Sequence, residues 1–128
     1  MTPPPRRPTD AELAILKVLW QTGPATVREI HAAISADKPA QYTTVLKLLQ
    51  IMTEKGLVRR DEQQRAHVYS AALPEEKTKQ LLVSDLLQRA FDGSARGLMM
   101  GALSSRKTSK AEIAEIRQLL DEYERKNR

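Results

Sequence analysis

The sequence predicts a mainly α-helical (α+β) protein that begins with a winged helix-turn-helix domain and ends in a helical segment. Two patterns support this class. Three segments with the 3.6-residue spacing of amphipathic helices precede two short segments in which apolar residues alternate. After Pro74 the pattern is helical to the end of the chain. A net charge of +5 over 128 residues favours a polyanionic partner.

The composition excludes several classes of protein and of site. The chain has no cysteine and two histidines, which rules out disulfides and leaves too few ligands for a four-coordinate zinc site. It contains no glycine-rich phosphate loop, no G-x-S-x-G motif and no H-E-x-x-H motif. It also lacks a run of about 18 apolar residues and the apolar centre of a secretory signal. We therefore expect a cytoplasmic protein that is not inserted in a membrane and has no catalytic residue, cofactor or metal.

The first eight residues form a segment of their own. Residues 1–8 hold four prolines beside Arg6 and Arg7. Because proline cannot sustain a helix, we expect a disordered basic arm over this stretch. Basic arms of some DNA-binding domains reach into a minor groove. An untethered tail is the commoner state of such a terminus, and we favour it here.

Two capping boxes mark the first two helices. Thr9 and Glu12 have the spacing of a capping box, and the apolar residues after them predict a helix over about residues 10–20 that ends at a Gly-Pro pair. Thr26 and Glu29 repeat the motif at the start of a second helix, which ends at an Asp-Lys-Pro sequence.

A third helix and a hairpin complete the first domain. Apolar spacing predicts a helix over residues 40–55, with Gly56 as its C-cap. Residues 57–60 and 66–69 are typical of two short strands joined by a polar turn at 61–64. Three helices followed by a hairpin is the order of a winged helix-turn-helix domain, which we place at residues 9–73.

The third helix is the candidate recognition helix. At 100° per residue its apolar side is expected to face the core. The polar side consists of Thr43, Lys47, Gln50 and Glu54. Hydroxyl, ammonium and amide groups are the donors and acceptors that read base edges in the major groove. A solvated helix face would have the same composition; the position of the helix after a second helix and before a hairpin favours DNA binding.

The hairpin adds positive charge beside this helix. Its arginines are Arg59, Arg60 and Arg65. Arg65 is predicted at the tip of the wing, where it would contact the sugar-phosphate backbone and add to the salt-dependent part of the affinity. We interpret His67 as a structural histidine rather than a metal ligand.

Residues 74–128 are predicted to form a helical dimerisation domain. A third capping box, at Ser109 and Glu112, begins the last helix. Fifty-five residues are too few to bury much core alone, so a second copy is expected to cover the apolar faces. The alternative is that these helices fold back onto their own winged helix. The expected interface residues are Leu82, Leu86, Phe91, Leu98, Ile113, Ile116 and Leu120.

Four stretches make the chain similar to a known family. They read "TDAELAILKVLW", "ATVREIHAAIS", "YTTVLKLLQIMTEKGLVRR" and "RAHVYSA". They resemble the BlaI/MecI/CopY family of penicillinase-type repressors, over about residues 9–124. The resemblance implies a winged helix with a C-terminal three-helix dimerisation domain, and a homodimer that represses a promoter at an inverted-repeat operator. It also implies DNA contacts at Thr43, Thr44 and Lys47, and in the wing near Arg65.

The resemblance also concerns regulation. In the antibiotic-resistance branch of the family, a membrane sensor with a metalloprotease domain triggers cleavage of the repressor. The Asn-Phe pair at which well-known members are cleaved has no counterpart here; the matching stretch consists of Met100, Gly101, Ala102 and Leu103. The copper-sensing branch carries a cysteine cluster that this chain lacks, so copper control is not expected. We predict a repressor of antibiotic-resistance or cell-envelope genes; the alternative is a winged-helix module that binds a protein and no operator.

Overall fold

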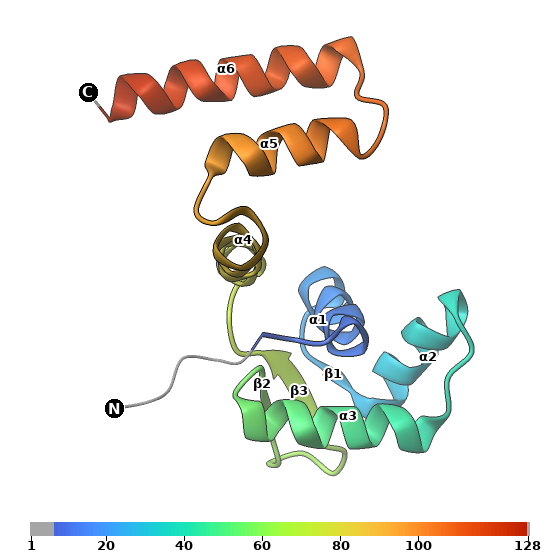
Figure 1. Ribbon diagram of the computed structural model, residues 1–128. Coiled ribbons are helices and arrows are strands. Elements are labelled where there is room, and N and C mark those ends of the chain that lie inside the picture. The colour runs from blue at the N-terminus through green and yellow to red at the C-terminus, as the bar shows by residue number, and fades with distance from the viewer. Residues whose placement is uncertain (1–6, 128) are drawn as a thin grey trace. The chain divides into compact units, whose positions relative to one another are not determined.

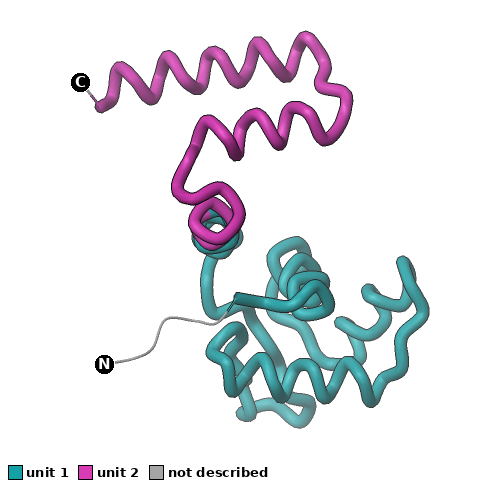
Figure 2. Tube along the Cα trace, viewed as in Figure 1, with its two compact units in different colours: residues 1–83 teal, residues 84–128 magenta. Residues whose placement is uncertain are grey.

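The computed structural model describes residues 7–127, which form two compact units. Figure 2 shows the border between Val83 and Ser84, inside the fourth helix. The elements are α1 (Asp10–Thr22), β1 (Ala25–Thr26), α2 (Val27–Asp37), α3 (Tyr42–Lys55), β2 (Val58–Asp61), β3 (Val68–Ala71), α4 (Glu75–Phe91), α5 (Ala95–Ser104) and α6 (Lys110–Lys126). Over the described residues, none of these helices has the length and apolar character of a membrane span.

Both predicted capping boxes of the first unit are confirmed. The Thr9 hydroxyl accepts the Glu12 N–H at 3.2 Å, and the Glu12 carboxylate accepts the Thr9 N–H at 2.8 Å. Thr26 and Glu29 exchange the same pair of hydrogen bonds at the start of α2. These bonds satisfy backbone donors that have no partner within the helix, which fixes where each helix begins.

The core of the first unit lies between α1, α2, α3 and the sheet (Figure 1). The predicted inner face of α3 is confirmed, because Val45, Leu49 and Met52 are buried in it. The helix ends at Gly56, whose φ of 80° is the left-handed conformation that glycine adopts without strain. The buried residues are Ile15, Leu16, Leu19, Ala25, Val27, Ile30, Val45, Leu49, Met52, Leu57, Val58 and Tyr69.

The sheet has one strand more than the sequence predicts. Its order is β1-β3-β2 and all pairs are antiparallel, with Ala25 opposite Tyr69 and Arg60 opposite the same tyrosine on the other side. β1 has only two residues, too few to show an alternating pattern. β3 begins two residues later than predicted, so His67 lies exposed in the hairpin loop rather than in a strand.

The borders of the predicted domains differ from those of the observed units. The prediction divides the chain after residue 73, whereas the compact units divide after Val83. In the first unit, the Trp20 indole N–H donates to the Leu73 carbonyl at 3.0 Å, and Thr78 of α4 is buried. The predicted arm at residues 1–8 lies, except for its last two residues, outside the described residues.

The second unit comprises the end of α4 together with α5 and α6. Neither α5 nor α6 contains a buried residue. Phe91 lies over two glycines of α5, because a Cβ added at Gly97 or Gly101 would come within 3.4 Å of its ring. The third predicted capping box is only half formed. Ser109 accepts the Glu112 N–H, but the Glu112 carboxylate binds Arg106 at 3.0 Å in place of the Ser109 N–H.

Candidate nucleic-acid interface

The outer face of α3 is open to solvent. Thr43, Thr44, Lys47 and Gln50 are all exposed, as the sequence predicts. Within the described part of the chain, the Lys47 ammonium makes no ion pair and is available to a ligand. The face therefore presents two hydroxyls, one ammonium and one amide on a single rigid helix.

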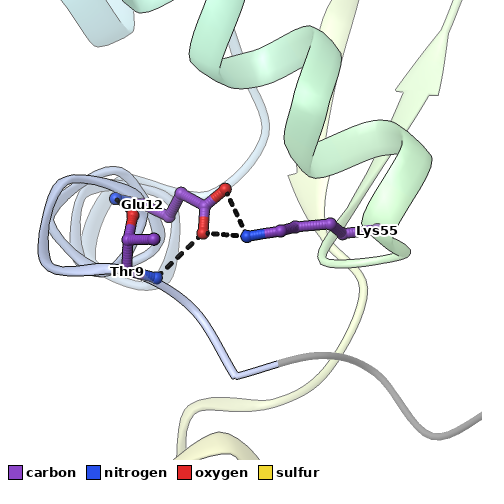
Figure 3. Close-up of polar contacts among 3 residues, drawn as sticks. All are labelled: Thr9, Glu12 and Lys55. Carbon is purple, nitrogen blue, oxygen red and sulfur yellow. Dashed lines mark hydrogen bonds and ion pairs between the residues drawn. The ribbon is translucent and has the colours of Figure 1, made fainter.

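The C-terminal end of α3 is held by an ion pair with α1 (Figure 3). The Lys55 ammonium donates to both carboxylate oxygens of Glu12, at 2.7 and 3.0 Å. Burial by itself would raise the pKa of Glu12. The hydrogen bonds from Lys55 and from the Thr9 backbone outweigh burial and lower this pKa below its ordinary value. Glu12 thus caps α1 and anchors α3 with one carboxylate.

The N-terminal end of α3 is held by a histidine of α2. His31 Nε2 lies 2.7 Å from the Ala40 carbonyl oxygen, in the turn between the two helices. The His31 ring also meets the Tyr42 ring edge to face, with the ring centroids 5.6 Å apart. Gln41, the N-cap of α3, makes no side-chain hydrogen bond to the helix. The start of α3 is therefore fixed in place while its first N–H groups lack a side-chain cap.

A cleft of about 810 Å³ lies beside this helix. The cleft lies between the start of α2, the N-terminal half of α3 and the hairpin loop, and Thr26 of β1 and Tyr69 of β3 complete its lining. Its lining residues are Thr26, Val27, Arg28, Tyr42, Leu46, Arg65, Ala66, His67 and Tyr69. Tyr42 and Leu46 adjoin Thr43 and Lys47 along the helix, so the cleft borders the outer face of α3.

The structure separates the three predicted wing arginines. Arg65 lines the cleft. Arg59 and Arg60 are successive residues of β2 and point to opposite faces of the sheet. Arg60 interacts with the Tyr69 side chain and forms an ion pair with Glu62, and both contacts raise its pKa. Its guanidinium is thus already engaged, whereas Arg65 makes no ion pair within the described residues.

Sequence reasoning missed Arg28 and Tyr42 as residues of this site. Arg28 lies between Thr26 and Glu29, whose spacing identifies a capping box at the start of α2. The motif needs no arginine, so it gave no sign that Arg28 lies at a binding site. The interpretation of His67 as a structural histidine rather than a metal ligand did not place it at this site. Its side chain is exposed and lines the cleft. No local signal could have joined Arg28 to a hairpin loop some forty residues away, because only the pairing of β1 with β3 brings them together.

The residues predicted for dimerisation and cleavage lie in α4, α5 and α6. Leu82, Phe91, Leu98 and Ile116 are partly buried, and Leu86, Ile113 and Leu120 are exposed. The stretch at residues 100–103 lies inside α5 rather than in a loop. Residues 105–109 form the non-helical link that follows it.

The first unit defines a winged helix-turn-helix domain, because three helices pack on a small antiparallel sheet whose hairpin loop lies beside the third helix. In proteins of this class the exposed third helix is the element that enters the major groove. The chain belongs to the penicillinase repressor family, since the family model matches residues 8–122. This match confirms the resemblance to penicillinase-type repressors that the sequence shows.

Individual relatives agree with this assignment. The transcriptional regulator BlaI of Mycobacterium tuberculosis is 38% identical over 88 residues, which cover 68% of this chain and 64% of that protein. The penicillinase repressor of Bacillus licheniformis is 26% identical over 94% of this chain and 92% of its own length. The solution structure of the DNA-binding domain of the repressor BlaI matches 59% of this chain and 90% of its own, with a TM-score of 0.51 and 25% identity.

Proposed function

We propose that this protein is a cytoplasmic transcriptional repressor that binds double-stranded DNA as a homodimer at an inverted-repeat operator. The observation that carries the proposal is the exposed outer face of α3, held at both ends and bordered by a basic cleft. In this proposal Thr43, Thr44, Lys47 and Gln50 meet base edges, and Arg65 meets the backbone. Membership of a repressor family supports regulation of transcription as the outcome of binding.

The second unit supports the homodimer. The helices α5 and α6 bury no residue within one chain, and Leu120 and Tyr123 remain 57% and 70% exposed. Exposed apolar residues that repeat along one helix are typical of an interface. A second copy of the same unit is the partner that matches an inverted-repeat site, because the symmetry of the protein then mirrors that of the DNA.

Selection of duplexes from a random-sequence pool tests the proposal. We expect the purified protein to enrich an inverted repeat, and a gel shift with that duplex to weaken steeply as salt increases. Enrichment of no sequence, together with no shift at low salt, would instead favour a winged-helix module whose outer face binds a protein.

Release of the operator by proteolysis is a further part of the proposal. A sensor metalloprotease that responds to a cell-wall antibiotic would cut between residues 96 and 107, which separates the two winged helices and lowers their effective concentration on DNA. The non-helical link at residues 105–109 is more accessible to a protease than residues 100–103, which lie in α5. The genes under control would then be antibiotic-resistance or cell-envelope genes.

Mass spectrometry of the protein from cells treated with such an antibiotic checks this mechanism. We expect fragments that end within residues 96–107 only after treatment. Intact protein in cells with a derepressed promoter would show that another signal acts.

A further inference from the structure

The cleft beside α3 has a one-sided charge. Arg28 from the start of α2 and Arg65 from the hairpin loop both line it, together with His67. None of its lining residues is an aspartate or glutamate. Neither arginine forms an ion pair within the described residues. Two arginines from different elements, neither of them in an ion pair within the described residues, therefore line one concave surface.

The position of Arg28 in α2 is unfavourable for a positive charge. It is the second residue of α2, and the N-terminus of a helix carries partial positive charge that disfavours a cation. Within the described residues the neighbouring carboxylate of Glu29 forms no ion pair with Arg28; it accepts hydrogen bonds from the Thr26 N–H and hydroxyl. Both hydrogen bonds lower the pKa of Glu29. An anion in the cleft would turn this unfavourable charge into a favourable contact.

We infer that the cleft binds the sugar-phosphate backbone of the DNA half-site whose major groove receives α3, with Arg28 as a phosphate-binding residue opposite Arg65. The inference rests on the proposed DNA binding and adds a backbone contact from α2. The cleft borders Thr43 and Lys47, so a strand that flanks the groove passes over it. Arg28 reads no base, and its contribution is the same on every sequence.

The test measures the affinity of the full-length wild-type protein and of its Arg28→Ala variant for two probes. The probes are the selected duplex and a mixed-sequence duplex of equal length. We expect both affinities to fall by the same factor, about five- to tenfold per bound subunit at low salt. The slope of log affinity against log salt should become shallower by about 0.9 for each lost phosphate contact. Lys17→Ala, which removes an exposed lysine from α1, is the matched control and should change neither quantity.

Two outcomes would overturn the inference. The first is an unchanged affinity and salt slope for Arg28→Ala, while Lys47→Ala still loses the selected duplex; this result leaves the proposed function intact. The second is unchanged DNA binding with loss of inorganic phosphate binding, which would make the cleft a site for a small anion. An unfolding temperature of Arg28→Ala equal to that of the wild type shows that the variant retains its fold. If the wild type binds neither duplex, the proposed function itself has failed.

Discussion

Lys47 and Lys55 are two lysines of the same helix in opposite environments. Lys47 lies on the exposed face of α3 and forms no ion pair within the described residues. Lys55 lies eight residues later, with its side chain only 18% exposed and its ammonium on the carboxylate of Glu12. The first is available to a ligand, and the second holds the helix on its domain. The two residues therefore give separate predictions, one for binding and one for stability.

Replacement of Lys47 tests recognition by the outer face. Lys47→Ala should weaken binding to the selected duplex by about 1–3 kcal/mol if the ammonium reads a base, and should reduce discrimination at that base pair. A phosphate contact would instead weaken binding to all duplexes equally and flatten the salt dependence. Gel shifts with single-base variants of the duplex separate these cases. Wild-type affinity on every duplex would exclude this face from the interface.

Replacement of Glu12 tests the ion pair. Glu12→Gln should lower the free energy of unfolding at neutral pH by about 2–3 kcal/mol, because it leaves a partly buried ammonium without its counter-charge. The pKa of Glu12 in the folded protein lies below the ordinary value of 4.5, so the stability from its charge is present above that value and is lost as the pH falls through the lowered pKa. Urea unfolding of both proteins over a series of pH values measures this.

Glu54→Gln is the control for this experiment, since Glu54 is exposed at the same end of α3. It should cost less than about 0.5 kcal/mol. A Glu12→Gln protein as stable as the wild type at neutral pH, or a deficit that grows as the pH falls, would contradict the assignment.

At the scale of elements, the glycines of α5 have a packing role that the sequence does not suggest. Glycine weakens a helix by about 1 kcal/mol relative to alanine, and from the sequence Gly97 and Gly101 predict only a weak helix. In the structure, an added Cβ at Gly101 would lie 3.3 Å from the Phe91 ring, closer than an ordinary contact. The missing side chain lets the last residue of α4 pack on α5. The packing between these helices thus depends on an absent methyl group.

A double-mutant cycle tests this contact. Gly101→Ala alone should stabilise the protein by clearly less than about 1 kcal/mol, or destabilise it, because the new methyl group meets the ring. In a Phe91→Ala background the same change should give the full gain of about 1 kcal/mol. Chemical unfolding of the four proteins measures the coupling energy. Equal gains in the two backgrounds would mean that Phe91 does not lie on Gly101.

At the scale of the whole molecule, the two units differ in how much they bury. The first unit has a continuous core that joins three helices and the sheet. In the second unit, α5 and α6 leave their apolar residues exposed or only partly buried. A unit of this size without a core is not expected to be stable alone, and this supports the role in dimerisation that we propose for it.

A charge on the apolar face of α6 tests this role. Leu120→Lys should convert the dimer into a monomer at micromolar concentration, since a lysine would have to be buried in the interface. It should also weaken operator binding, because the two winged helices are no longer linked. Light scattering measures the mass, and Gln118→Lys on the opposite side of α6 is the matched control. A wild-type protein that is monomeric under these conditions would exclude the dimer.

The sequence by itself determined the features that depend on neighbours within a few residues. The starts of α1 and α2, the C-cap at Gly56 and the separation of the two faces of α3 all follow from side chains three or four positions apart. The exposed positions Thr43, Lys47 and Gln50 could therefore be predicted. The family resemblance rests on the same local stretches.

Only the tertiary structure decided the features that join distant segments. Lys55 meets Glu12 across 43 residues, and Arg28 lines the same cleft as the hairpin loop because the two residues of β1 pair with β3. Arg60 binds Tyr69 and Glu62, which a count of arginines in the wing does not indicate. Such contacts depend on where helices and strands pack, and periodicity gives each element's faces without its partners. For this reason the sequence predicted the exposed face of α3, while the cleft beside it emerged only from the fold.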